Sequence, residues 1–456
     1  MKKIFTLIFS ALSISFTMAQ GSWSSVGSGL NLPVQALAAD TANDILYAGG
    51  LFTQSGLLPA VGIAKWNGTS WSQVGGGISG LGISAMLIRN GKLIVGGTFS
   101  GIGGILTKNI AEWNGLSWSP LGSGFEYTGA TTVSTLMSYG GDLYAGGSFS
   151  TSGLASVNHI AKWNGITWEP LGSGVNGTVS SMCVYNGELY VAGSFTNAGG
   201  VIVNNIAKWD GSSWSDVGGG LEYTGATTVS TLREFNGELY AGGRFSIAGS
   251  TSVSNIAKWN GVSWSDVNGG VDYTGATTVS TLQVYNNNLI VGGTFTEAGG
   301  NPAGYIAKWD GTSWSTLGSG MNAAVTSLET YGGKLFAGGP FLFAGGNLVP
   351  FIAKWQQSSQ RSMTPAGNTE EPATGSISPN PVKDNGMVKL NIPLDAYPGT
   401  SFSFSVYDIA GRKITGVNNI HNEFYFDKTN LAAGSYFFKI TNNKNMVLQE
   451  GKLLIE

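Results

Sequence analysis

The sequence predicts an all-β protein: a seven-bladed β-propeller closed by its N-terminal strand, followed by a small C-terminal β-sandwich. The propeller is predicted by a tryptophan-containing motif that recurs every 46 to 50 residues, a period typical of propellers and solenoids. Glycines are also frequent, with 71 in 456 residues, which indicates many tight turns between short strands. After Trp355 the motif stops and the sequence becomes polar, which predicts a linker and then a second domain.

The N-terminus has the features of a secretory signal peptide. Lys2 and Lys3 precede an apolar run at 4–16, and small residues before position 20 fit cleavage after Ala19. We therefore expect a signal peptide at 1–19 and an exported protein. No other run approaches the roughly 20 apolar residues of a membrane-spanning helix, so the mature protein is predicted to have no transmembrane segment.

Composition excludes some partners and constrains the fold. The formal net charge is −3 without a block of one sign, so we expect no nucleic-acid partner. Cys183 is the single cysteine, so the fold must be stabilised by its core and not by disulfides.

The repeated motif is "IAKWNGTSW" at Ile63–Trp71, and all 14 tryptophans belong to it. The first Trp recurs at 66, 113, 163, 209, 259, 309 and 355, and the second at 23, 71, 118, 168, 214, 264 and 314. Each unit predicts four strands, exemplified by 133–139, 142–149, 159–163 and 167–172. Asn-Gly or Gly-Gly pairs predict tight turns between the first two strands and between the last two. A two-residue turn would place Trp66 opposite Thr69, and a four-residue turn would place it opposite Trp71.

The ends of the array predict a closed ring. The chain enters at Gly21–Gly27 with a fourth strand that has no third strand before it, and it ends at Ile352–Trp355 with a third strand that lacks a fourth. The first segment is therefore expected to complete the last blade of a propeller that comprises residues 20–356, and to leave no open sheet edge.

This pattern, a strand ending in Gly-Gly and an aromatic residue followed by Trp in the last hairpin, resembles the kelch-type β-propeller, as in the galactose oxidase central domain. The resemblance covers residues 21–356 and implies the fold. It does not imply one function, because kelch-like rings serve as enzymes, protein binders and carbohydrate binders.

Residues 357–375 are predicted to be a linker, and 376–456 resemble the type A C-terminal sorting domain of the type IX secretion system. The residues that carry this resemblance are Pro379, Asn380, Pro381, Asp408, Gly411, Arg412, Gly434 and Tyr436. The resemblance implies export through the periplasm of a Gram-negative bacterium by the type IX secretion machinery, followed by release or surface attachment. The alternative is an ordinary carbohydrate-binding sandwich.

Residues suited to catalysis are scarce. The chain has two histidines, His159 and His421, and the ring contains only Arg89, Arg233 and Arg244. A copper site, a Ser-His-Asp triad or a sialidase-type arginine cluster is therefore not expected. We expect no enzyme, no metal and no cofactor, although a hydrolase that uses two loop carboxylates stays open.

A ten-residue segment, "YTGATTVSTL", occurs identically at Tyr127–Leu136, Tyr223–Leu232 and Tyr273–Leu282. Units with this segment carry four extra residues before the first strand, on the face that holds the longer loops. The predicted ligand-binding residues are the three tyrosines and the preceding acids, because rings stack on sugars and carboxylates accept hydroxyl hydrogen bonds: Tyr127, Tyr223, Tyr273, Glu126, Glu222 and Asp272. Recent duplication of whole units is the competing explanation.

Together these features predict a secreted or cell-surface, non-catalytic and monomeric binding protein. Glycan binding through the loop face is the leading hypothesis, and a protein-binding or adhesion surface is the alternative.

Overall fold

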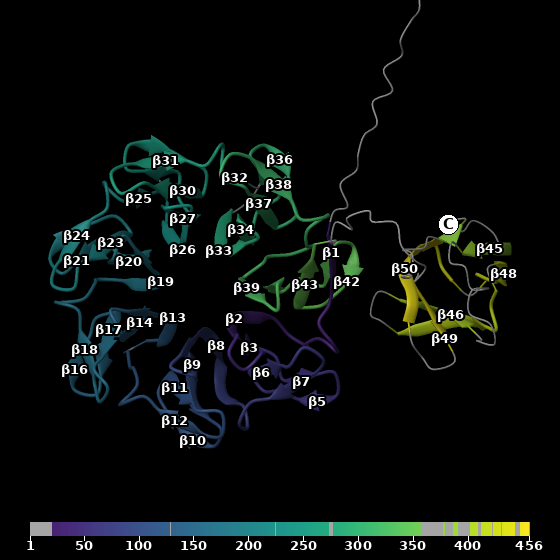
Figure 1. Ribbon diagram of the computed structural model, residues 1–456, viewed down its shortest axis with the longest axis horizontal. Helices are drawn as coiled ribbons and strands as arrows, with labels where there is room; N and C mark the ends of the chain where they lie inside the picture. Colours follow the sequence, from purple (N-terminus) through teal and green to yellow (C-terminus); the bar gives the residue numbers. More distant parts are fainter. Residues whose placement is uncertain are drawn as a thin grey trace, which may run out of the picture. The chain divides into compact units, whose positions relative to one another are not determined.

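The computed structural model is built from β-strands alone in the residues that it describes (Figure 1). These residues are 21–127, 129–223, 225–272, 277–357, 377–378, 386–390, 402–408, 412–421, 423–429, 431–442 and 447–455. The chain divides into two compact units, residues 1–360 and 361–456. The signal peptide and almost all of the linker lie outside the described residues, so they stay predictions.

In the described part of the first unit, seven sheets of four or five strands repeat one antiparallel pattern, in which consecutive strands are neighbours. The first sheet contains β2 (Val34–Asp40), β3 (Ile45–Gly50), β6 (Ile63–Trp66) and β7 (Trp71–Gln73). The second contains β8 (Ile78–Arg89), β9 (Lys92–Ile102), β10 (Ile105–Leu106), β11 (Ile110–Trp113) and β12 (Trp118–Pro120). The third contains β13 (Thr132–Tyr139), β14 (Asp142–Ser148), β17 (Ile160–Trp163) and β18 (Trp168–Pro170). The fourth sheet contains β19 (Thr178–Tyr185), β20 (Glu188–Ser194), β23 (Ile206–Trp209) and β24 (Trp214–Asp216). The fifth contains β26 (Thr228–Phe235), β27 (Glu238–Arg244), β30 (Ile256–Trp259) and β31 (Trp264–Asp266). The sixth contains β33 (Thr278–Tyr285), β34 (Asn288–Thr294), β37 (Ile306–Trp309) and β38 (Trp314–Thr316).

The seventh sheet joins the two ends of the repeat array. It contains β39 (Ser327–Tyr331), β40 (Lys334–Gly338), β43 (Ile352–Gln356) and, as its outermost strand, β1 (Ser22–Ser25). β1 pairs with β43 in a register that places Trp23 opposite Trp355, as the equivalent tryptophans are placed in the other sheets. The N-terminal segment thus supplies the fourth strand that the last repeat lacks.

The first strands of the seven sheets lie side by side around a common centre (Figure 1). Each contacts the first strand of the next sheet, and β39 of the last sheet contacts β2 of the first. Where these strands meet, Val279 of β33 lies so close to Gly242 of β27 that a Cβ at Gly242 would clash with it. The first glycine of the Gly-Gly pair therefore allows neighbouring sheets to approach closely.

The turns between strands are of two kinds. Asn90 and Gly91, both with positive φ, form the two-residue turn expected between β8 and β9, where Arg89 pairs with Lys92. Between β6 and β7, however, Trp66 pairs with Trp71, so this turn has four residues. The Oδ1 atom of Asn67 accepts a hydrogen bond from the backbone N–H of Ser70 at 2.8 Å, which explains the asparagine.

The tryptophan pairs link neighbouring sheets. In every sheet the two rings lie 5.1 to 5.5 Å apart between centroids. The indole N–H of the second Trp donates to a backbone oxygen of the preceding sheet or the segment that follows it, as Trp264 does to Val217 at 2.8 Å. The same bond is made by Trp23, Trp71, Trp168, Trp214 and Trp314. Trp118 differs, because its buried N–H has no hydrogen-bond partner among the described residues.

Tyrosines at the ends of the first strands reach the following sheet. The hydroxyl of Tyr185 donates to the backbone oxygen of Gly237 at 3.1 Å, and Tyr331 donates to that of Asp44 at 2.9 Å across the junction between the last and first sheets. Tyr139 and Tyr285 make equivalent bonds.

The change Tyr185→Phe should lower the free energy of unfolding by about 1 kcal/mol, because it removes one such bond and leaves the ring in place. Chemical denaturation of the full chain measures this loss. Phe235, which occupies the equivalent position of β26, shows that a phenylalanine fits there. A variant as stable as the wild type would contradict a stabilising role for this hydroxyl.

The second unit contains two described sheets, formed by β44 (Ile377–Ser378), β45 (Gly386–Leu390) and β48 (Glu423–Phe426), and by β47 (Lys413–Asn418), β46 (Phe402–Tyr407), β49 (Gly434–Asn442) and β50 (Val447–Ile455). Phe404 lies at the centre of its core and packs against Phe424, Phe426 and Phe438. This unit therefore has a hydrophobic core of its own.

Candidate binding surface on the loop face

The loops of the candidate site are supported by short hairpins that sequence analysis did not predict. Each hairpin lies between the second and third strands of a sheet, and the segment before the first strand pairs with its edge. The described examples are β4 (Gln54–Ser55) with β5 (Leu58–Pro59), β15 (Thr151–Ser152) with β16 (Ala155–Ser156), β21 (Asn197–Ala198) with β22 (Val201–Ile202), β28 (Ile247–Ala248) with β29 (Thr251–Ser252), β35 (Glu297–Ala298) with β36 (Asn301–Pro302), and β41 (Phe343–Ala344) with β42 (Asn347–Leu348). In the sequence, the Ala-Gly-Gly that recurs at 198–200, 298–300 and 344–346 indicates the turns of these hairpins.

These hairpins hold the acidic residue that precedes each repeated segment. Glu126 forms an isolated bridge with Thr151, whereas Glu222 lies in β25 (Leu221–Glu222) and pairs with Ile247. Asp272 lies in β32 (Val271–Asp272) and pairs with Glu297. The backbone before each tyrosine is therefore held by hydrogen bonds to the hairpin of its own repeat.

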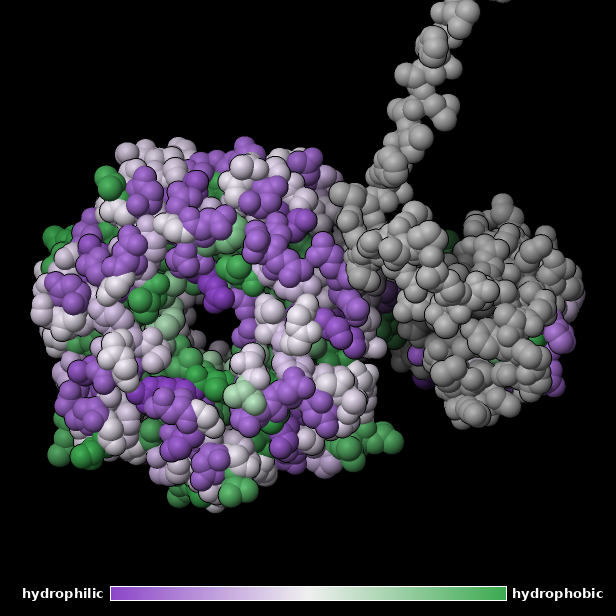
Figure 2. All heavy atoms as spheres, in the orientation of Figure 1, coloured by the Kyte–Doolittle hydropathy of each residue, from purple (hydrophilic) through white to green (hydrophobic). Residues whose placement is uncertain are grey.

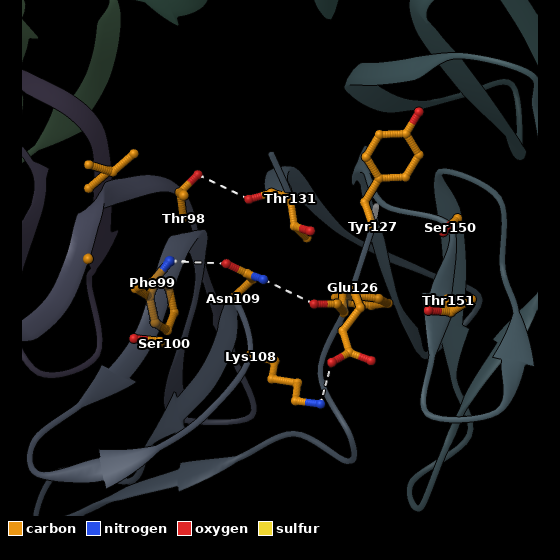
Figure 3. Close-up of a pocket in the computed structure, with 13 residues that line it drawn as sticks. Thr98, Phe99, Ser100, Lys108, Asn109, Glu126, Tyr127, Thr131, Ser150 and Thr151 are labelled. Carbon is orange, nitrogen blue, oxygen red and sulfur yellow. Dashed lines mark hydrogen bonds and ion pairs between the residues drawn. The ribbon is translucent and has the colours of Figure 1, made fainter. Parts of the chain in front are cut away.

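The first copy borders a hollow of about 690 Å³ between the second and third sheets. Figure 3 shows Tyr127 and Glu126 on one side and Asn109 and Lys108 on the other. The remaining lining residues are Gly80, Leu81, Thr98, Phe99, Ser100, Phe125, Thr131, Ser150 and Thr151. The hollow thus combines an aromatic ring with hydroxyl, amide and charged groups.

Polar contacts order the floor of this hollow. Lys108 forms an ion pair with Glu126 (Figure 3). The side chain of Asn109 accepts a hydrogen bond from the backbone N–H of Phe99 at 3.0 Å and donates one to the backbone oxygen of Phe125 at 3.0 Å, so it links the second sheet to the segment before the third. Tyr127 is 45% exposed. A ligand would therefore meet a fixed polar floor and an accessible ring.

His159 lies beside Tyr127, with ring centroids 6.0 Å apart. Its Nδ1 atom is 3.3 Å from the backbone oxygen of Gly147, and burial lowers the pKa of the imidazole from its ordinary value. A lowered pKa favours the neutral ring at pH 7, so His159 adds an uncharged, half-buried ring to the tyrosine.

The second copy has different neighbours. Tyr223 is 38% exposed, and the guanidinium of Arg244 lies 5.2 Å from the centroid of its ring. Glu222 accepts a hydrogen bond from the side-chain amide of Asn204 at 2.6 Å. Identical sequence therefore creates a different chemical surface in this repeat.

In the third copy, Tyr273 lies outside the described residues, and Asp272 is the predicted site residue that the structure places. Its Oδ1 atom accepts from the hydroxyl of Thr277 at 3.4 Å. The six predicted residues thus belong to three separate repeats, and Glu126 is the one carboxylate among the residues that line the hollow.

No helix among the described residues is long and apolar enough to cross a membrane. The described residues also contain no group of three or more His, Cys, Asp or Glu side chains that could hold a metal ion.

In the second unit, Arg412 contacts the carboxylate of Asp408 twice. Its Nε atom lies 2.7 Å from Oδ2, and its backbone N–H donates to Oδ1 at 2.9 Å. The hydroxyl of Tyr436 donates to the backbone oxygen of Ala432 at 3.0 Å, near Gly434 at the start of β49. Pro379, Asn380, Pro381 and Gly411 lie outside the described residues.

Comparison with solved structures finds several β-rich proteins at low identity. The extracellular domain of a hybrid two-component system from B. thetaiotaomicron has a TM-score of 0.46 and 12% identity over 97% of this chain and 59% of the other. PorZ, a surface component of the type-IX secretion system of Porphyromonas gingivalis, has a TM-score of 0.42 and 16% identity over 91% and 58%. A fungal alcohol oxidase in complex with copper has a TM-score of 0.43 and 14% identity over 95% and 99%. The chain therefore spans less than two thirds of the first two proteins.

A search of curated proteins found no match. Among protein families, residues 376–456 match the one described as "Secretion system C-terminal sorting domain". This match confirms the resemblance of the second unit to a type IX sorting domain, and with it export to the cell surface or outside of a Gram-negative bacterium. The chain thus carries a C-terminal sorting domain of the type IX secretion system.

Proposed function

We propose that the exported protein is a non-catalytic glycan-binding module, built as a closed, seven-bladed kelch-type β-propeller whose ligands bind on the loop face. The seven repeated sheets, their contacts around a common centre and the pairing of β1 with β43 support the propeller. On this proposal the propeller comprises residues 20–356, the linker 357–375 and the sorting domain 376–456.

The observation that carries glycan binding is the hollow beside Tyr127. An exposed aromatic ring can stack on the C–H face of a sugar, while hydroxyl, amide and carboxylate groups exchange hydrogen bonds with the sugar hydroxyls. Ser100, Ser150 and Thr151 supply hydroxyls, and Glu126 supplies acceptors. Because the floor is already ordered by Lys108 and Asn109, little conformational entropy is lost on binding.

We propose a non-catalytic role because the hollow offers one carboxylate, whereas glycoside hydrolysis ordinarily needs two, about 5 to 10 Å apart. The carboxylate of Glu126 is also held in an ion pair with Lys108.

The second candidate is a protein-binding surface, and exposed apolar side chains in or next to the short strands that follow the second strand of each sheet favour it. Leu57, Leu106, Leu154 and Ile202 project from four consecutive sheets, each at least 83% exposed. Figure 2 shows apolar residues, in green, at the rim of this unit. Burial of such side chains in a partner would contribute to binding energy.

Glycan-array binding by the full mature chain tests the first candidate. The change Tyr127→Ala should reduce binding about 5- to 30-fold, because ring stacking on a ligand contributes about 1 to 2 kcal/mol. Leu116→Ala, a control at an exposed four-residue turn outside the hollow, should leave binding unchanged. Equal binding by wild type and Tyr127→Ala would remove this hollow from the proposal, and a chain that binds protein but no glycan would support the second candidate.

A further inference from the structure

Arg244 occupies a position that small residues hold in the other two copies of the repeated segment. It ends β27 and pairs across the sheet with Thr228, as Ser148 pairs with Thr132 and Thr294 pairs with Thr278. The three positions are therefore structurally equivalent.

In the other two copies the side chain at this position bonds to the strand or loop beside it. The hydroxyl of Ser148 donates to the backbone oxygen of Ala130 at 3.0 Å, and that of Thr294 accepts from the backbone N–H of Thr278 at 3.0 Å. Arginine cannot accept a hydrogen bond, and its longer side chain reaches Tyr223 instead.

The contact with Tyr223 holds the guanidinium without using its N–H groups. Attraction between the cation and the ring face acts perpendicular to the ring, at 5.2 Å from its centroid. No hydrogen bond or ion pair joins the guanidinium of Arg244 to any residue that the structure describes, and nearby Glu222 is bonded to Asn204. The donors of a half-buried arginine thus stay available beside an exposed ring.

We propose that Tyr223 and Arg244 form a subsite for a carboxylate-bearing sugar, a uronic acid within a glycan chain. The guanidinium offers two parallel N–H donors that match the two oxygens of a carboxylate, and the accessible part of Tyr223 contacts the sugar ring. This inference rests on the proposed glycan-binding function and gives one repeat a preference for acidic glycans. The first copy, with Ser148 at the position equivalent to Arg244, lacks that preference.

The test compares oligogalacturonate with its methyl-esterified form, which has the same sugar ring and no charge. Titration calorimetry with the full mature chain should show at least tenfold tighter binding of the acid than of the ester. Arg244→Thr, which installs the residue that the third copy carries, should remove this difference and preserve the fold. Added salt should weaken binding of the acid to the wild type and leave binding of the ester little changed.

The reciprocal variant Ser148→Arg is the matched control. It should give the protein a second acid-selective subsite, beside Tyr127 in the first copy, and this is measured as an increase in the binding stoichiometry of oligogalacturonate. Equal affinity of wild type for acid and ester, or an acid preference that survives Arg244→Thr, would overturn this inference while the glycan-binding proposal stands. A folded chain that binds no glycan on the array would overturn the proposed function itself.

Discussion

Deletion of residues 376–456 should trap the protein in the periplasm and remove essentially all of it from the cell surface and the medium. The deleted segment is the sorting domain, and its described sheets enclose a core separate from those of the seven sheets. The remaining unit should therefore fold while losing the signal that the secretion machinery recognises. Immunoblots of periplasmic, surface and medium fractions from a host with a type IX system measure the result.

Two controls separate sorting from folding. The truncated protein should keep the circular dichroism spectrum and thermal transition of the seven-sheet unit. Residues 376–456 fused to a periplasmic reporter should carry the reporter out of the cell. Arrival of the truncated chain at the surface in wild-type amounts would contradict a sorting role for residues 376–456.

The change Trp264→Ala should lower the free energy of unfolding by about 3 to 5 kcal/mol. Trp264 is buried against Trp259, with ring centroids 5.3 Å apart, and its N–H donates to Val217 of the segment that follows the preceding sheet. The change therefore creates a cavity and breaks a bond between neighbouring repeats. Chemical denaturation of the seven-sheet unit measures the loss.

The comparison of Trp264→Phe with Trp118→Phe isolates the hydrogen bond. Both changes remove a similar apolar area, but only Trp264 has an N–H partner, because that of Trp118 is buried without one among the described residues. Trp264→Phe should therefore cost about 1 kcal/mol more than Trp118→Phe. Equal losses would show that the bond to Val217 contributes nothing to stability.

The repeat architecture was accessible from sequence because the elements that define it are local. Asn90-Gly91 specifies its turn through backbone conformation alone, and the alternation of Val133 to Tyr139 predicts a strand that the structure places at Thr132–Tyr139. The length of the turn after Trp66 was left open, because either length puts the tryptophans on one face. The side-chain oxygen of Asn67 accepts hydrogen bonds that stabilise a turn of four residues, and these bonds depend on three-dimensional geometry.

The site was less predictable, because its properties come from neighbours that are distant in sequence. The ten residues that begin at Tyr127 are identical to those that begin at Tyr223, yet one tyrosine ring lies beside His159 and the other under Arg244. His159 and Arg244 appeared in the sequence as isolated residues without partners. Pairing of Glu126 with Lys108 likewise depends on contact between adjacent sheets.

The contact of Gly242 with Val279 has a consequence for how such a chain can lengthen. In the fifth sheet and in most of the others, the second strand carries the glycine of this joint and the first strand of the next sheet carries the apolar residue that meets it. A repeat copied whole from these sheets therefore brings a complementary surface for both of its new neighbours. The bonds made by Trp264 and Tyr185 follow the same rule. A duplicated unit can therefore be accommodated without compensating substitutions at its borders, and residues away from the joints can differ between units, as Arg244 differs from Ser148.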